Sequence, residues 1–286
     1  MKFHEKYVSK SALIGLVRFI FLVCPIYLVT RIIRIIRGEK YNGIWLICER
    51  KHEARDNGYH LFKYIRTNHP SVKIYYLITK DSKDFPKIAA LGSYIYFGSL
   101  KHYFYYFLAE KHISSHGRGK GCMPDIHAFT LFEKIFKFRV KKVDIKHGIT
   151  KDFQVALTKE KSGIDLFVCG SFPEYQFVLD NFGYEPHEVK YLGLARFDNL
   201  HTYTTKNQIM YMPTWRTWLG NQDEEKFRSS TYYKQLKKLI SNTKLHSLLE
   251  MTNMDLVFCL HPLMQNYARL FDVNHERIIV ATNEQF

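Results

Sequence analysis

The chain has 286 residues, of which 46% are hydrophobic and 24% charged; this excludes a disordered protein and allows two domains with a sizeable core. Its 42 Lys and Arg residues against 27 Asp and Glu give a net charge of +15, which leaves nucleic acid, an anionic membrane face and phosphate-rich substrates as partner classes. The five cysteines form no CxxC pair and mostly lie in apolar runs. We therefore expect free thiols in a reducing compartment, and neither a disulfide framework nor a zinc site.

The most apolar stretch lies near the N-terminus, over residues 13–36. Its first part is interrupted by Arg18 and Pro25 and is shorter than the roughly 20 apolar residues of a spanning helix. Arg31, Arg34 and Arg37 then recur every three residues among isoleucines, which predicts a helix with cations on one face and apolar side chains on the other. We interpret residues 1–40 as a monotopic helical segment on an anionic membrane surface. A helix packed on the protein's own core and a true span are the alternatives.

From residue 41 the chain alternates short β-rich runs with helical stretches such as Gly58–Asn68 and Leu100–Glu110. This alternation predicts a Rossmann-like domain with a parallel sheet over residues 41–205, on the acceptor side of the molecule. Ligands of such sheets bind beyond the carboxyl ends of the strands. The predicted strands are Ile44–Cys48, Lys73–Thr79, Ser93–Phe97, His112–Ser115, Lys142–Ile145 and Leu166–Cys169.

A second series begins near residue 206 and extends to residue 286. We expect strands at Ile209–Met212, Leu256–Leu260 and Arg277–Ala281, and one long helix over Thr231–Leu249. These elements make a partial Rossmann-like domain on the donor side. The predicted fold class is therefore α/β and GT-B-like, with two Rossmann-like domains facing a cleft, the second incomplete, and an N-terminal membrane-associating helix.

His147 follows a predicted strand and precedes Gly148. A histidine at a strand end, before a turn that glycine permits, suits a general base near neutral pH. Lys151, four residues on, is placed to contact a phosphate. The alternative is a histidine that only forms hydrogen bonds within its loop.

Two arginine motifs follow. In the first, Arg196 is a candidate for a bidentate phosphate contact or for a structural ion pair with Asp198. In the second, Thr214, Trp215 and Arg216 combine a hydroxyl, a flat ring and a cation after a proline turn, which suits a nucleotide diphosphate. The alternative for the second motif is a tryptophan that anchors its loop.

Three further segments carry polar groups at strand ends. His261 ends a predicted strand and is followed by Pro262, so it repeats the pattern of His147 in the second domain. Asp56 and Asn57 lie at a helix N-terminus, where capping and substrate binding are both open interpretations. The Gly-rich, basic segment Ser114–Gly121 lacks the Walker A order; a mobile loop near the acceptor and a plain surface loop both fit it.

Five of these motifs, in this order, resemble those of the CDP-glycerol glycerophosphotransferases, the teichoic acid primases and polymerases of bacterial cell walls. The resemblance runs from about Trp45 to the C-terminus. The motifs are Ala54-Arg55-Asp56-Asn57-Gly58, His147-Gly148 with Lys151, Gly193-x-x-Arg196-x-Asp198, Pro213-Thr214-Trp215-Arg216 and His261-Pro262.

The resemblance implies a GT-B-like enzyme at the cytoplasmic face of the cell membrane. It would transfer glycerol phosphate from CDP-glycerol, or ribitol phosphate from CDP-ribitol, to a lipid-linked polymer acceptor for wall teichoic acid or capsule, releasing CMP. By the same resemblance, His147 is the general base, while Arg216 and His261 contact the donor phosphates. Family members usually continue to a motif close to Thr-Asp-Tyr-Ser-Ser, which this sequence lacks, so we expect a member truncated at its C-terminus.

Two alternatives stay open: a GT-B glycosyltransferase that uses a nucleotide sugar, and an inactive truncated protein that binds membrane or polymer. No helix-turn-helix, zinc finger or aromatic RNA-binding strand is visible, so we expect no nucleic-acid partner. No cluster of metal ligands is evident either. We expect no metal site and no cofactor, and a Mg²⁺ requirement stays open.

Overall fold

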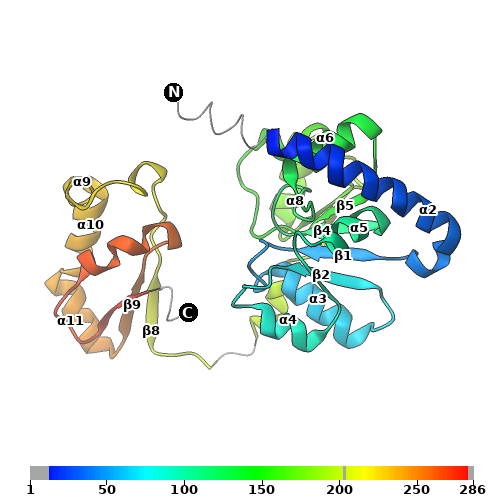
Figure 1. The fold of residues 1–286 in the computed structure, drawn as a ribbon. Coiled ribbons are helices and arrows are strands. Elements are labelled where there is room, and N and C mark those ends of the chain that lie inside the picture. The colour runs from blue at the N-terminus through cyan, green and yellow to red at the C-terminus, as the bar shows by residue number, and fades with distance from the viewer. Residues whose placement is uncertain (1–12, 202–203, 283–286) are drawn as a thin grey trace. The chain divides into compact units, whose positions relative to one another are not determined.

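The structure, a computed structural model, describes residues 13–201 and 204–282. The chain divides into two compact units, residues 1–201 and 202–286, and each has its own parallel sheet (Figure 1). Helices follow the strands in both units, so the predicted α/β class is confirmed.

The first unit is built on a seven-stranded sheet in the order β3-β2-β1-β4-β5-β6-β7, and every neighbouring pair is parallel. Six of these strands lie within one residue of their predicted bounds. The seventh, β7, was not among the predicted strands. The strands are β1 (Trp45–Cys48), β2 (Ile74–Ile78), β3 (Tyr94–Tyr96), β4 (Lys111–Ser114), β5 (Lys141–Asp144), β6 (Leu166–Cys169) and β7 (Val189–Tyr191).

Helices cover both faces of this sheet (Figure 1). Along each strand alternate residues point to opposite faces, so Ile47 packs with Phe62 of α3 whereas Leu46 packs with Leu108 of α5. Helices α3 and α4 lie on one face, and α5, α6 and α8 on the other. The helices are α3 (Asn57–Asn68), α4 (Phe85–Leu91), α5 (Leu100–Leu108), α6 (Ile126–Phe136), α7 (Lys159–Ser162) and α8 (Phe172–Asn181); short 3₁₀ turns are η2 (Val155–Leu157) and η3 (Ala195–Asn199).

The N-terminal segment is helical from Leu13 to Tyr41, through a π turn, η1 (Phe19–Val23), into α2 (Cys24–Tyr41), which is kinked at Arg37. Pro25 does not interrupt it, because the π turn just before it accommodates the missing N–H group. Its inner face packs on α5 and α6, where Val23 and Ile26 join the aromatic core. By length and composition alone this helix could cross a membrane, a test that core helices also pass.

The outer face of the same helix is apolar and open to solvent. Phe21, Leu28, Ile32, Ile35 and Ile36 are between 56% and 82% exposed. One face of the segment therefore packs on the protein's own core, as one of the alternatives predicted, and the other is an exposed apolar surface.

The second unit holds a three-stranded parallel sheet in the order β10-β9-β8, with β8 (Gln208–Tyr211), β9 (Asp255–Cys259) and β10 (Ile278–Ala281). The prediction of one helix over Thr231–Leu249 was wrong: the chain forms α10 (Thr231–Ile240) and α11 (Thr243–Thr252). Asn242 separates them, and its side chain accepts a hydrogen bond from the backbone N–H of Lys244 as a new N-cap. These helices pack on the sheet with α9 (Glu224–Ser229) and the 3₁₀ segments η4 (Thr217–Leu219) and η5 (Pro262–Phe271).

Candidate functional site

The loops that follow β1, β4 and β5 meet at the carboxyl edge of the seven-stranded sheet. The strand order reverses its direction between β1 and β4, which are neighbours although β2 and β3 lie between them in the chain. Doubly wound sheets bind ligands at this switch point, beyond the strand ends. The candidate site of the first unit is therefore built from these loops.

The turn after β5 is held at both ends by buried carboxylates. Lys146 adopts a left-handed conformation with φ +53°, and its N–H donates to Oδ1 of Asp144 at 2.9 Å. Burial raises the pKa of the Asp144 carboxyl. Farther on, Glu174 accepts hydrogen bonds from the N–H groups of Thr150 and Gly170 at 2.6 and 2.7 Å. These contacts fix the short segment that carries His147.

The imidazole of His147 has a defined tautomer. Its Nδ1 lies 3.0 Å from the carbonyl oxygen of Ser115, and because a carbonyl only accepts, Nδ1 carries the proton in the neutral ring. The lone pair is then on Nε2. His147 is exposed and lines a pocket of about 510 Å³ together with His116, Arg118 and Lys146. The ring is therefore prepared to accept a proton from a group bound there.

His116 is a residue of this pocket that the sequence analysis did not single out. Its ring stacks on His147 with centroids 4.3 Å apart and an interplanar angle of 16°, and its Nδ1 lies 2.9 Å from Oγ of Ser115. Burial, and then the nearby His147, lower the pKa of His116 to about 4. Near pH 7 His116 is therefore a neutral ring against one face of His147. The signal for it was its place in the Gly-rich loop after a strand.

A hydrogen-bond network contacts this turn and consists of Asp56, Asn57 and Arg196. Nη1 of Arg196 donates to Oδ1 of Asp56 at 2.5 Å and to the carbonyl oxygen of His147 at 2.8 Å. The ion pair expected as one option between Arg196 and Asp198 is not formed; Asp56, 140 residues away in sequence, takes that place. The network ties two other chain segments, at residues 56–57 and at Arg196, to the His147 turn.

Asn57 is fully buried, and its amide is used by backbone groups. Its Nδ2 donates to the carbonyl oxygen of Lys146 at 2.8 Å, and its Oδ1 accepts from the N–H of Arg196 at 3.0 Å. Asp56 also caps α3, since its Oδ1 accepts from the N–H of Asn57 at 2.8 Å.

The buried carboxylate of Glu49 binds backbone N–H groups at the start of α3. Glu49, just after β1, accepts hydrogen bonds from the N–H groups of Arg55, Asp56 and Tyr59 at 2.6 to 2.9 Å. Burial raises the pKa of Glu49, although these three donors favour its ionised form. Gly58 is required here, because a Cβ at this position would lie 2.8 Å from Cγ of Glu49.

Lys151 and Asp198 stand apart from this network. Both side chains are exposed, and neither forms a hydrogen bond or ion pair with any residue that the structure describes.

The remaining predicted residues gather in the second unit. Trp215 stacks on His261 with centroids 5.2 Å apart and an interplanar angle of 15°. Thr214 and Arg216 line a pocket of about 540 Å³ with Tyr232, and the Arg216 guanidinium lies 5.7 Å from the centre of the Tyr232 ring. This pocket offers a cation, a hydroxyl and aromatic rings at the carboxyl end of β8.

His261 has the opposite tautomer to His147. Its Nδ1 accepts a hydrogen bond from the N–H of Leu263 at 3.2 Å at the start of η5, so in the neutral ring the proton is on Nε2. An Nε2–H group can donate to an anion.

Within residues 13–201 and 204–282 there is no group of three or more His, Cys, Asp or Glu residues arranged to hold a metal ion.

Comparisons with known proteins bear on both units. A family profile described as CDP-Glycerol:Poly(glycerophosphate) glycerophosphotransferase matches residues 28–285. The minor teichoic acid biosynthesis protein GgaB of Bacillus subtilis (strain 168) is 30% identical over 233 residues, which cover 78% of this chain and 26% of that protein. The chain thus spans about a quarter of the length of this curated relative.

Solved structures share the fold. The wall teichoic acid polymerase TagF aligns with a TM-score of 0.51 at 14% identity, over 84% of this chain and 66% of that one. A TagF variant soaked with CDPG aligns with a TM-score of 0.56 at 13% identity, over 95% of this chain and 69% of that one. At this identity the likeness establishes the architecture of the chain.

Proposed function

The chain belongs to the CDP-glycerol:poly(glycerophosphate) glycerophosphotransferase family, as its motifs predicted, and we propose that it transfers glycerol phosphate or a related alditol phosphate in teichoic acid synthesis. The donor would be CDP-glycerol or CDP-ribitol, and the acceptor a hydroxyl group at the end of a lipid-linked polymer of the cell wall or capsule. The name of the relative GgaB, a teichoic acid biosynthesis protein, supports this product class.

His147 is the proposed general base, and its hydrogen bond to Ser115 is the observation that carries the proposal. That bond holds the proton on Nδ1 and leaves Nε2 to take the proton of the acceptor hydroxyl. As the proton moves, the acceptor oxygen bonds to the phosphorus that bears glycerol, and the bond from this phosphorus to the bridging oxygen of CMP breaks. Such a base typically contributes about 10²- to 10⁴-fold in rate.

The second unit supplies the proposed donor-binding groups. Phosphoryl transfer depends on cations and hydrogen-bond donors aimed at the phosphate oxygens. Arg216 offers a guanidinium, Thr214 a hydroxyl and His261 an Nε2–H group, and Trp215 holds the His261 ring by stacking.

We assign Asp56, Asn57 and Arg196 to positioning rather than to substrate contact. Asn57 is buried, and Arg196 binds both Asp56 and the carbonyl oxygen of His147. Lys151 and Asp198 are exposed, so both remain candidates for contact with substrate.

We propose a membrane location, and the N-terminal helix supports it. The exposed apolar face of α2 suits insertion at the membrane–water interface as a monotopic anchor. All five cysteines are free thiols, which agrees with the cytoplasmic face, where the compartment is reducing.

The test is release of CMP from CDP-glycerol by the full chain in membranes that contain a lipid-linked acceptor. His147→Ala should lower release by at least 10²-fold, whereas His187→Ala, at an exposed histidine of the same unit, should not. Parallel reactions with EDTA and with added Mg²⁺ determine the metal requirement. Equal release by wild type and His147→Ala would refute the base assignment.

A further inference from the structure

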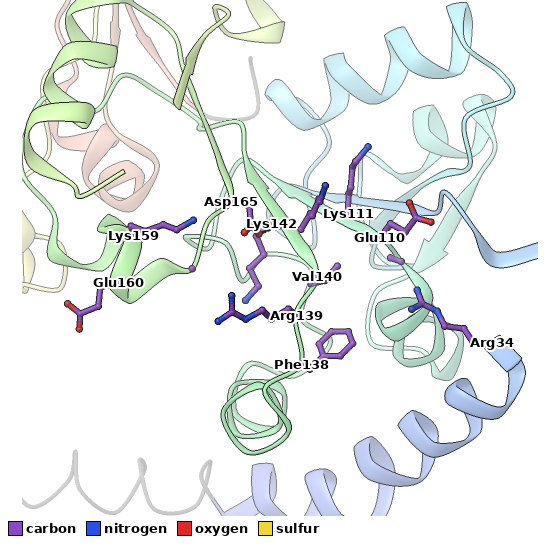
Figure 2. A pocket seen from close by; sticks show the side chains of 13 residues that line it. Arg34, Glu110, Lys111, Phe138, Arg139, Val140, Lys142, Lys159, Glu160 and Asp165 are labelled. Carbon is purple, nitrogen blue, oxygen red and sulfur yellow. Dashed lines mark hydrogen bonds between the residues drawn. The ribbon is translucent and has the colours of Figure 1, made fainter. Parts of the chain in front are cut away.

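Two pockets of the protein differ in how their charges are balanced. The first has a volume of about 770 Å³ and lies at the amino edge of the seven-stranded sheet, around the starts of β4 and β5 (Figure 2). Figure 2 shows Arg34 and Glu110 on one side of this pocket and Lys159 and Glu160 on the other. Because its carboxylates offset its cations, this pocket does not select a ligand by charge.

The second pocket, of about 540 Å³, is the proposed donor site of the second unit. It extends from the loop after β8 to the first turn of α10. Of the residues that the structure describes, Arg216 is the one charged residue that lines it. The charge of Arg216 is therefore not offset by a carboxylate in the pocket wall, which favours an anionic ligand.

The Arg216 guanidinium is bound to carbonyl oxygens of its own loop. Its Nη1 donates to Thr214 at 3.1 Å and to Trp215 at 3.4 Å, and no carboxylate within the described ranges pairs with it. The guanidinium lies over the Tyr232 ring, 5.7 Å from its centre. A phosphate can replace the two carbonyl oxygens, because a guanidinium binds an ionised oxygen more strongly than a neutral one.

Tyr232, the second residue of α10, carries a buried hydroxyl group. Its oxygen forms no hydrogen bond with any residue that the structure describes. Leaving a buried donor unsatisfied costs free energy, and for that reason most buried polar groups in native proteins have partners. A ligand atom that accepts a hydrogen bond from this hydroxyl would remove that cost.

The Tyr232 hydroxyl is a donor at neutral pH. Burial raises the pKa of Tyr232, and the positive charge of Arg216 opposes this rise, so the hydroxyl lies within electrostatic range of the guanidinium. Both groups donate hydrogen bonds. A negatively charged acceptor bound beside them would satisfy both.

We propose that Tyr232 is a further donor-binding residue, whose hydroxyl donates a hydrogen bond to the same phosphate of the CDP-activated donor that Arg216 binds. The inference rests on the proposed function and adds a residue that lies outside the five sequence motifs. On binding, Arg216 exchanges the carbonyl oxygens of Thr214 and Trp215 for phosphate oxygens. Its movement off the Tyr232 ring opens the hydroxyl to the ligand.

The adjacent residue Tyr233 provides a matched control. Its hydroxyl donates to the carbonyl oxygen of Leu270 at 3.1 Å, its ring packs on Phe271, and it does not line the pocket. Tyr232→Phe and Tyr233→Phe therefore remove the same atom, from a group without a partner in the first case and from a hydrogen-bonded group in the second.

The experiment measures the dissociation constant of CDP-glycerol for the full chain by titration calorimetry, with no acceptor present. Tyr232→Phe should raise Kd about 10- to 100-fold, or about 1.4 to 2.8 kcal/mol, as for a hydrogen bond to a charged group. Tyr233→Phe should change Kd by less than about threefold. An unchanged Kd in Tyr232→Phe would overturn the inference and leave the proposed function standing. If wild type does not bind CDP-glycerol, the donor assignment and the inference both fail.

Stability distinguishes a ligand contact from a structural role. Urea unfolding in a Trp45→Phe background reports on the second unit, which holds the other two tryptophans, Trp215 and Trp218. The midpoint should be unchanged or higher in Tyr232→Phe, since its hydroxyl has no bond to lose, and lower in Tyr233→Phe. An equal fall in both variants would give the Tyr232 hydroxyl a structural role and overturn the inference.

A double-mutant cycle tests whether the two side chains share one phosphate. Tyr232→Phe is combined with Arg216→Met, and Kd for CDP-glycerol is measured for both single variants and the double variant. We expect a coupling of at least about threefold in Kd, because the two groups bind the same ligand atom group. Losses that simply add would place the two side chains on different parts of the donor and overturn the shared site.

Discussion

Removing the guanidinium of Arg196 should loosen the turn that carries His147 without deleting a group that touches substrate. The variant Arg196→Met keeps most of the apolar length of the side chain. It loses the 2.5 Å ion pair with Asp56 and the 2.8 Å hydrogen bond to the carbonyl oxygen of His147. Both contacts belong to Nη1, so one substitution removes them together.

The expected size of the effect follows from exposure. The Arg196 and Asp56 side chains are 35% and 17% exposed, so the pair is partly screened and contributes about 1 kcal/mol rather than the larger value of a buried pair. The bond to the His147 carbonyl adds about 1 kcal/mol. We expect Arg196→Met to lower the free energy of unfolding of the first unit by about 2 kcal/mol. A double-mutant cycle with Asp56→Asn, which keeps the helix cap, should give a coupling energy of about 1 kcal/mol.

Trp45 allows the first unit to be followed by itself. It is the only tryptophan of residues 1–201, so urea unfolding in a Trp215→Phe/Trp218→Phe background reports on that unit. In the activity assay, which uses the native tryptophans, Arg196→Met should lower kcat while leaving KM for the donor nearly unchanged. Arg66→Met is the control, because it also removes two hydrogen bonds to carbonyl oxygens in this unit but lies away from the turn. A coupling energy below about 0.3 kcal/mol, or an equal loss of kcat in the control, would refute this reasoning.

Three further outcomes are expected. Burial lowers the pKa of His112 to about 3, so between pH 6.5 and 3 the unfolded chain binds a proton that the folded chain does not. The free energy of unfolding therefore falls as the pH falls through this range. His112→Gln should flatten this slope by up to about 1.4 kcal/mol per pH unit in urea titrations. Gly58→Ala should cost about 1–3 kcal/mol in the same measurement, since its Cβ meets the fixed Glu49 side chain, and an unchanged midpoint would contradict this. Arg216→Met should raise KM for CDP-glycerol about 10- to 100-fold, whereas Arg228→Met, which removes a similar cation–ring contact, should not. Equal KM values for wild type and Arg216→Met would remove Arg216 from the donor site.

The strands of the first unit were predictable because buried parallel strands are short apolar runs bounded by polar turns. Trp45–Cys48 and Leu166–Cys169 show this pattern directly in the sequence. Strand β7 was harder to assign, since it is only three residues long and two of them are exposed. Its pairing with β6 depends on a neighbour that sequence periodicity does not reveal.

Helix boundaries were less predictable, for local reasons. The apolar spacing continues through Thr231–Leu249, but the side chain of Asn242 caps a new helix there. Conversely, Pro25 suggested an interruption that a π turn avoids. In both places the helix boundary depends on which hydrogen bond a backbone group makes, and hydrophobic periodicity does not reveal this.

The candidate site was predictable as a set of motifs and not as a set of contacts. The strand-end position of His147 was visible in the sequence, whereas the partner of Arg196 was not, because Asp56 is 140 residues away. His116 was missed for a similar reason. Its stacking on His147 arises only because β4 and β5 are neighbours in the sheet.

The strands β4 and β5 also act as a spacer between the two ends of the first unit. From Lys111 to Ser114 the chain advances three residues, about 10 Å at roughly 3.3 Å per residue. Whatever contacts the amino edge of these strands is therefore separated by at least that distance from a ligand at the His147 turn.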